Sequence, residues 1–226
     1  FAGFRMAQAT RTTAQTAGLS DDPLENAADW FTVNRKLIAI VLTSVAAVAA
    51  LIVVFRYMEA SKREKASTAL YQAQAPLSQG NSAAAETQLQ RVVSNYGGTS
   101  SGQQAALILA QLRYDAGKHA EGIAGLESSL GSASDEFKPA FESLIAMGYE
   151  AQGKYAEAAD HYGKAAASAK FDGEKAQFEA SQARHLMQAG KLEEARKIWE
   201  KYAQREDQPL FQEARVRLGE IAGAAK

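Results

Sequence analysis

The sequence predicts an all-α fold: one transmembrane helix, then a solenoid of about four helical hairpins and a C-terminal capping helix. Three observations lead to this prediction. Residues 37–55 carry no charged side chain. Four glycines, each at the end of an amphipathic stretch, recur at intervals of 37, 36 and 37 residues. From Glu59 onward the residues that favour helices are abundant, and no alternating pattern typical of strands competes with them.

Residues 1–36 are expected to form a polar N-terminal tail that contains one short helix. Asp21 or Asp22 can cap this helix, and Pro23 suits its first turn. We expect the helix to lead directly into a membrane span.

The uncharged run from Leu37 to Phe55 predicts a transmembrane helix, which we place at residues 37–57. At about 1.5 Å per residue the run spans roughly 28 Å, close to the ~30 Å hydrocarbon core of a bilayer. Residues typical of the membrane interface flank the run, namely Trp30, Phe31, Arg35, Lys36, Arg56 and Tyr57. One face carries a stripe of small residues suited to close packing against another membrane helix, namely Ala39, Thr43 and Ala47.

Residues 58–226 repeat a packing pattern around four glycines, namely Gly80, Gly117, Gly153 and Gly190. Glycine readily adopts the left-handed backbone that ends a helix and reverses the chain. A small residue stands seven positions before and five positions after each glycine, namely Ala73, Ala110, Ala146, Ala183, Ala85, Gly122, Ala158 and Ala195. A bulky residue stands nine positions after each, namely Leu89, Leu126, Tyr162 and Trp199. The pattern therefore predicts four hairpins whose helices meet at the small residues.

Prolines bear on the first and the last helix of this array. Pro76 is expected to kink or interrupt the first helix, because proline lacks the backbone N–H that an α-helix needs. The final stretch, residues 210–226, predicts a capping helix that Asp207 can cap and Pro209 can open.

The stretch "IAMGYEAQGKYAEAADHYGKAA", residues 145–166, resembles a tetratricopeptide repeat (TPR) in its spacing of small, aromatic and glycine residues. The third and fourth hairpins match this pattern well, the second matches moderately, and the first is degenerate. The resemblance implies an α-solenoid that holds other proteins on its surface.

A single membrane helix followed by degenerate TPR hairpins also resembles the bacterial inner-membrane family that includes the ancillary subunit of the Sec translocon. This resemblance implies a single-pass protein of the inner (cytoplasmic) membrane, with a cytoplasmic N-terminus and a periplasmic repeat domain. The flanking charges alone leave the orientation open, because Lys62, Arg63 and Lys65 follow the span and favour a cytoplasmic repeat domain.

The composition and the motifs argue against several classes of function. A net charge of −1 provides no field to attract nucleic acid, and the absence of cysteine excludes thiolate chemistry and disulfides. Residues 148–154 match G-x-x-x-x-G-K, but Tyr155 follows where a P-loop needs Ser or Thr. His119, His161 and His185 lie in different hairpins, without an i, i+4 partner for a metal. We therefore expect no enzyme activity, cofactor, metal or small-molecule substrate.

The first helix of each hairpin lines the concave face of a TPR array. The predicted partner-binding groove consists of Gln74, Leu107, Gln111, Tyr114, Met147, Glu150, Arg184 and Met187. The lysine and asparagine clamp that chaperone adaptors of the family use for a terminal carboxylate is absent, so we expect the groove to take an apolar or mixed helix or strand. Tyr114 and Met147 are equally open to interpretation as core residues.

These observations favour a membrane-anchored scaffold or accessory subunit that helps to assemble a larger inner-membrane complex. The host is open between a translocon and a bioenergetic complex such as a photosynthetic reaction centre with its antenna. The alternative is a periplasmic holdase chaperone that binds client segments in the groove. The expected partners are other membrane proteins and the lipid bilayer.

Overall fold

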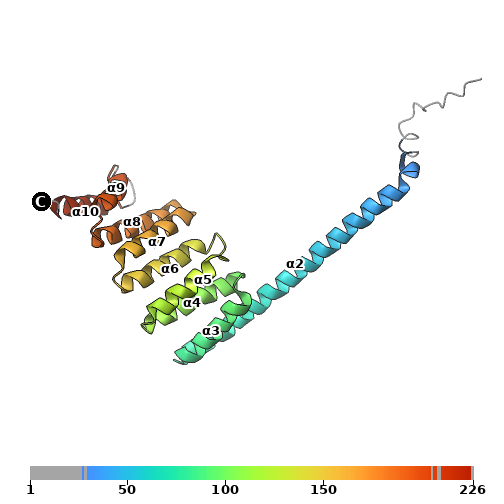
Figure 1. Cartoon of the computed structure of the whole chain (residues 1–226), viewed down its shortest axis with the longest axis horizontal. Helices are drawn as coiled ribbons and strands as arrows, with labels where there is room; N and C mark the ends of the chain where they lie inside the picture. The colour runs from blue at the N-terminus through green and yellow to red at the C-terminus, as the bar shows by residue number, and fades with distance from the viewer. Residues whose placement is uncertain (1–26, 28–29, 205, 208–209, 225–226) are drawn as a thin grey trace, which may run out of the picture. The chain divides into compact units, whose positions relative to one another are not determined.

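The computed structural model describes residues 27, 30–204, 206–207 and 210–224, and every regular element among them is helical (Figure 1). The helices are α2 (Arg35–Ser78), α3 (Ser82–Tyr96), α4 (Ser100–Asp115), α5 (His119–Leu130), α6 (Lys138–Ala151), α7 (Tyr155–Ser168), α8 (Asp172–Gln188), α9 (Leu192–Tyr202) and α10 (Phe211–Ala224). The prediction of an all-α fold is confirmed. The short helix expected around Pro23 and the role expected for Pro209 lie outside the described residues.

Contacts divide the chain into two units, Phe1–Tyr57 and Met58–Lys226, and helix α2 contributes to both. In the first unit the apolar side chains of α2 are exposed, and none of the most apolar 18-residue stretch is buried. Helix α2 is therefore a candidate membrane span by its length and composition.

The polar groups inside this apolar stretch are satisfied within the helix. The hydroxyl of Thr43 donates to the carbonyl of Ala39 at 2.8 Å, and the hydroxyl of Ser44 donates to the carbonyl of Ile40 at 2.8 Å. Because these donors already have backbone partners, the two hydroxyls do not interrupt the apolar surface with unpaired N–H or O–H groups.

The second unit stacks four antiparallel hairpins, formed by the end of α2 with α3, α4 with α5, α6 with α7, and α8 with α9. The glycine in each turn has a left-handed backbone, with φ of 71° at Gly80, 74° at Gly117, 71° at Gly153 and 76° at Gly190. The residue after each glycine donates its N–H to the carbonyl five residues earlier. This is the Schellman pattern of helix ends, and it confirms the prediction that the four glycines end helices and close hairpins.

The small and bulky positions predicted from the repeat are all buried. Leu89, Leu126 and Trp199 are each 0% exposed. The second hairpin has glycine rather than alanine at the small position, because a Cβ on Gly122 would lie 2.3 Å from Cε1 of Tyr114. The close approach of the two helices therefore follows directly from the repeated small residues.

The prediction that Pro76 interrupts the first helix is wrong, because α2 continues through Pro76 to Ser78. Proline removes one N–H from the helix ladder, but here the loss falls in the last turn, where the helix is about to end. The carbonyl of Pro76 accepts hydrogen bonds from the N–H groups of Gln79 and Asn81, at 3.1 and 2.9 Å, and so helps to close the first turn.

Helix α10 covers the end of the array by packing on α9. Phe211, Ala214 and Ile221 are its buried residues. The helix begins at Phe211, directly after Leu210. Leu210 has a φ of 69°, which is unusual for a residue other than glycine and costs about 1–3 kcal/mol of backbone strain.

Candidate protein-binding surface

The predicted groove residues lie on the first helix of each hairpin, with seven of the eight on α4, α6 and α8 and Gln74 on α2. Helix α4 contacts α6, residues of α2 and α4 share one core cluster, and Glu150 of α6 contacts His185 of α8, so these first helices lie side by side along one face of the array. We call this face the inner face. Its side chains fall into three kinds: buried residues, exposed residues, and residues held in ion pairs.

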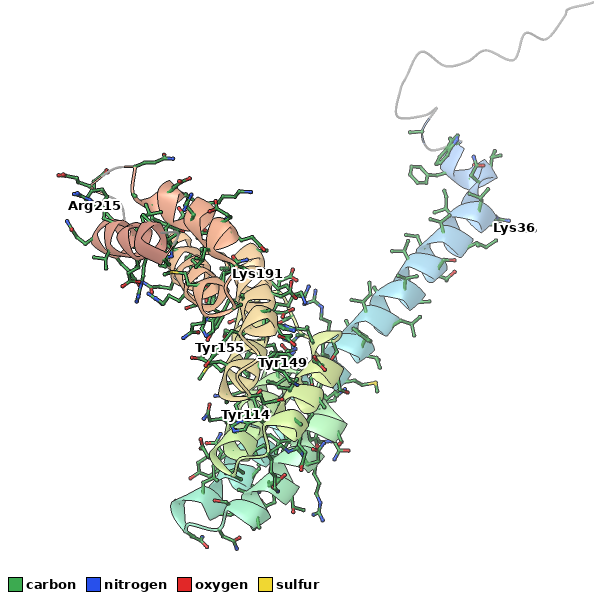
Figure 2. The ribbon with its side chains drawn as sticks, turned by 60° about the vertical axis from the view of Figure 1, so that its left-hand side comes forward. Lys36, Tyr114, Tyr149, Tyr155, Lys191 and Arg215 are labelled. Carbon is green, nitrogen blue, oxygen red and sulfur yellow. The ribbon has the colours of Figure 1, made fainter. Side chains whose placement is uncertain are left out.

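Tyr114 is a core residue and not part of an open surface. It is 9% exposed, and its hydroxyl donates to the carbonyl of Leu144 on α6 at 3.0 Å. Its ring lies in the space left by Gly122 and Gly148, and burial raises the pKa of its phenol well above the usual range. Figure 2 labels Tyr114 among the helices of the second unit. Of the two interpretations of Tyr114 that the sequence leaves open, the structure selects the core.

Met147 is the exposed apolar residue of the predicted set, with 46% of its surface accessible. Gln111 is also exposed, and its amide donates to the carboxylate of Asp115 at 2.9 Å on the same helix. Gln74 and Leu107 are half-buried. Methionine and glutamine side chains are long and adaptable, so this part of the inner face can adjust to the shape of a partner.

Glu150 is the last of the groove residues on α6, and its carboxylate lies next to α8. Its Oε2 lies 3.2 Å from Nε2 of His185, a buried residue of α8 that is 7% exposed. Burial first, and then the charge of Glu150, raise the pKa of the neighbouring Tyr162 to about 12, against the charge of Arg184, which lowers it. Glu150 and Arg184 therefore lie close to the same buried tyrosine.

Arg184 forms an ion pair with helix α10. Its Nε and Nη2 atoms donate to the two carboxylate oxygens of Glu213, both at 2.7 Å. These hydrogen bonds hold the pKa of Glu213 below its usual range. Met187 and Arg184 line a shallow hollow together with Gln188 and with Arg217 of α10. The predicted residues of α8 therefore meet at the junction of the last hairpin with the capping helix.

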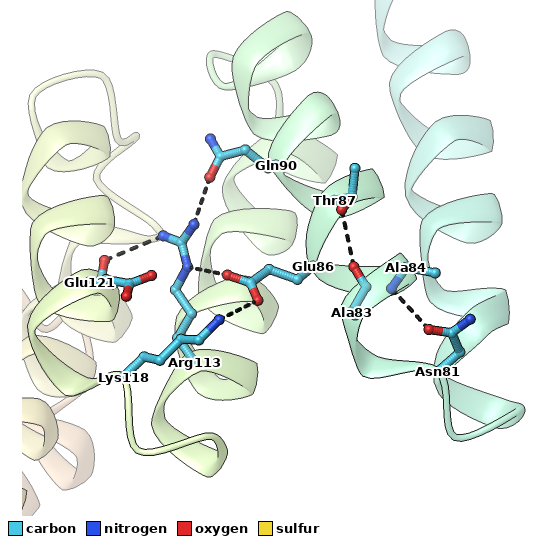
Figure 3. A network of polar contacts seen from close by, with 9 residues as sticks. All are labelled: Asn81, Ala83, Ala84, Glu86, Thr87, Gln90, Arg113, Lys118 and Glu121. Carbon is cyan, nitrogen blue, oxygen red and sulfur yellow. Dashed lines mark hydrogen bonds and ion pairs between the residues drawn. The ribbon is translucent and has the colours of Figure 1, made fainter.

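A different polar network joins the first two hairpins (Figure 3). Glu86 of α3 accepts hydrogen bonds from Lys118 and from Nε of Arg113, both at 3.0 Å. Hydrogen bonds from Lys118 first, and then from Arg113, lower the pKa of Glu86. Arg113 also donates to the side chain of Gln90 at 2.9 Å and to the carbonyl of Glu121 at 3.3 Å. Because Arg113 bonds to residues on both sides of it in the chain and shares the carboxylate of Glu86 with Lys118, this network ties the first hairpin to the second.

Sequence reasoning missed His185, Glu213 and Arg217 as neighbours of the groove residues. The repeat pattern places Arg184 and Met187 on the inner face, but it does not say which charge of the capping helix meets them. The capping helix carries two acidic residues, Glu213 and Glu220, and only the tertiary structure decides between them. The described residues contain no group of three or more histidine, aspartate or glutamate side chains that could hold a metal.

The stripe of small residues in the first unit lies on one exposed face of α2, at Ala39, Thr43 and Ala47. The hydroxyl of Thr43 is used within the helix, with the carbonyls of Ala39 and Ile40 as acceptors at 2.8 and 3.0 Å. A close neighbour at this stripe would therefore be held by packing of small side chains and not by the Thr43 donor.

Comparison with known proteins assigns the repeats. The family model described as "Tetratricopeptide repeat-like domain" matches residues 28–222. A comparison with curated proteins gives no match. Among solved structures, the nearly identical TPR-like repeats of a Podosopora anserina kinesin light chain are 18% identical, with a TM-score of 0.54 over 72% of this chain and 88% of that chain. A variant of the same repeats is also 18% identical, with a TM-score of 0.53 over 72% of this chain and 87% of that one. At this identity the structures show a shared fold.

Proposed function

Because the chain belongs to the tetratricopeptide repeat-like family, we propose that it is a non-catalytic scaffold or accessory subunit of a larger inner-membrane complex. TPR-like repeats form a protein–protein interaction scaffold. The observation that carries the membrane part of the proposal is the exposed apolar half of α2, of which no residue in the most apolar stretch is buried. A helix with apolar residues on all sides needs an apolar environment around it.

The proposed arrangement has a membrane span at residues 37–57 and a repeat domain at 58–226. Trp30 and Phe31 are 58% and 57% exposed before the span, and Tyr57 is 76% exposed after it. Aromatic residues at these positions suit the two membrane interfaces. We place the repeat domain in the periplasm and the N-terminus in the cytoplasm of a bacterium. A protease-protection assay on spheroplasts tests this placement, because a cytoplasmic repeat domain would survive added protease.

The proposed docking surface consists of the exposed residues Gln111, Met147 and Glu150 of the inner face, together with the half-buried Met187. Met147 is the exposed apolar anchor on this surface, and Glu150 of α6 and Gln111 of α4 provide exposed polar groups. Mixed apolar and polar groups suit a helix or strand of another protein. Tyr114 is left out of this surface because it is buried.

Purification of the tagged full-length protein in a mild detergent tests the proposal. The expected result is a set of membrane proteins that copurify in fixed ratio, and their identity distinguishes a translocon from a bioenergetic complex such as a photosynthetic reaction centre with its antenna. A scatter of exported proteins in low and variable amounts would instead support a periplasmic holdase.

Variants then locate the docking surface. The pair of changes Gln111→Ala and Met147→Ala should reduce the copurified partners several-fold without lowering the melting temperature, because both side chains are exposed. Lys197→Ala on the exposed surface of α9 is the matched control. Full recovery of partners by the double variant would exclude the inner face as the docking surface.

A further inference from the structure

Each of the two ring nitrogens of His185 faces an oxygen atom that can accept a hydrogen bond. Nδ1 lies 2.7 Å from the backbone carbonyl of Ser181, one turn earlier in α8. Nε2 lies 3.2 Å from the carboxylate oxygen of Glu150 on α6. The contact at Nε2 has the distance of an ion pair but lacks the alignment of a hydrogen bond, and Nε2 is buried without another partner.

Carbonyl and carboxylate oxygens only accept hydrogen bonds. Because a lone pair on Nδ1 would repel the carbonyl oxygen of Ser181 at 2.7 Å, neutral His185 carries its single proton on Nδ1. Its Nε2 then presents a lone pair to the negative carboxylate of Glu150, and the two repel each other. In the imidazolium form, Nε2 carries a proton and attracts the carboxylate.

We propose that His185 and Glu150 form a proton-controlled latch between the third and fourth hairpins. Protonated His185 holds the carboxylate of Glu150 against α8, and neutral His185 releases it. Histidine is the side chain whose charge ordinarily changes within the physiological range of pH, which makes this contact suited to a proton-controlled latch.

The other ionisable groups around His185 do not replace Glu150 as its partner. Tyr162 and Tyr155 of α7 contact the imidazole through their rings, with centroids 4.9 and 6.3 Å away. Burial raises the pKa of Tyr162 to about 12, so this phenol stays neutral while the imidazole titrates. Arg184, the neighbour of His185 in α8, is bound to Glu213 of α10. Among residues 30–204, no ionisable side chain of α9 forms an ion pair or ring contact with His185.

The latch changes the surface that we propose for docking. While His185 is charged, the carboxylate of Glu150 is neutralised by its neighbour. When His185 loses its proton, Glu150 becomes an unpaired negative charge on the inner face, where it can meet a lysine or arginine of a partner. This consequence rests on the proposed function, whereas the latch itself does not and is tested without a partner.

Selective labelling of histidine with ¹⁵N in the full-length protein in detergent micelles tests the latch, because the chain has only three histidines. The signals of His185 are assigned by their loss in His185→Gln. The expected spectrum shows protons on both nitrogens at pH 5.5 and on Nδ1 alone at pH 8. A neutral ring with its proton on Nε2 at pH 8 would overturn the proposal.

Thermal unfolding of Glu150→Gln provides a second test. The contribution of Glu150 is present while His185 is charged and is lost as the pH rises. Glu150→Gln should therefore lower the melting temperature at pH 5.5 and leave it unchanged or raised at pH 8, where the amide can donate to the bare Nε2. Glu193→Gln, which changes an exposed carboxylate beside Arg196 on α9, is the control and should shift the melting temperature equally at both pH values. An equal loss at both pH values in Glu150→Gln would contradict the latch.

Discussion

The apolar stretch of α2 and the repeat hairpins use the same small residues in opposite ways. Ala47 in α2 is exposed, whereas Ala158 in α7 is 0% exposed. Residues 37–55 are apolar on every side of the helix, so no single face is suited to a neighbouring helix of the same chain. In the hairpins, small residues recur at fixed distances from a turn, so each one meets another helix. The difference teaches that the spacing of alanine, and not its frequency, decides whether it is buried.

The largest effect is expected from a bulky residue at a buried small position. Ala158→Trp should destabilise the repeat domain by roughly 1–3 kcal/mol, because the indole has no space between α6 and α7. The measurement is the thermal or denaturant unfolding of the full-length protein in detergent, followed by circular dichroism.

Ala47→Trp is the matched control for that comparison. The same side chain is added to an exposed position of α2, so the unfolding of the repeat domain should not change. Equal destabilisation by the two variants would show that the two regions do not differ in packing as the structure indicates.

The next effect concerns Gly122, where the ring of Tyr114 leaves no room for a Cβ atom. Alanine normally stabilises a helix interior relative to glycine by about 1 kcal/mol. In Gly122→Ala the new Cβ would lie 2.3 Å from the ring of Tyr114, so we expect a net loss of roughly 1–3 kcal/mol. Gly219→Ala in α10 meets nothing within 4 Å and should instead be neutral or stabilising. Chemical denaturation of both variants checks the opposite signs.

A smaller effect is expected from the ion pair that joins α8 to the capping helix. Hydrogen bonds from Arg184 lower the pKa of Glu213 in the folded protein, so the stabilisation is present above the unfolded pKa of about 4.3 and is lost as the pH falls through the folded pKa. Glu213→Gln should cost on the order of 1 kcal/mol at pH 7, since the pair is partly exposed.

The pH dependence distinguishes this pair from a general effect of charge. The difference in unfolding free energy between the wild type and Glu213→Gln should shrink as the pH is lowered from 7 toward 3. A difference that stays constant over this range would show that the pair with Arg184 does not stabilise the fold.

The smallest effect is expected at Lys197, which is exposed on α9. Lys197→Ala should change the unfolding free energy by less than about 0.5 kcal/mol, because exposed charges contribute little. If this variant and Ala158→Trp melted at the same temperature, the repeat register would be wrong.

Much of the fold could be predicted from the sequence because its signals are local. A glycine that ends a helix adopts a positive φ whatever surrounds it, and Gly80, Gly117, Gly153 and Gly190 all do. The small and bulky positions repeat at the same distances from these turns, so their burial follows from the hairpin geometry. Pro76 was misjudged because the effect of a proline depends on where the helix ends, and α2 ends two residues later.

The candidate site was less predictable because its side chains are defined by contacts between distant segments. Tyr114 occupies a groove position in the repeat pattern, but the absence of side chains at Gly122 and Gly148 opens a space that draws its ring into the core. Arg184 also occupies a groove position, but its guanidinium donates to the carboxylate of Glu213, which lies 29 residues later in the chain.

The sequence by itself determined the all-α class, the four hairpins with their turns, and an apolar helix long enough to cross a membrane, because periodicity and backbone preference act over a few residues. Only the tertiary structure decided that Tyr114 is core, that Met147 is exposed, and that Glu150 faces His185. These outcomes depend on which side chains from separate helices come within a few ångströms of one another, and the residue pattern of a single helix does not predict such contacts.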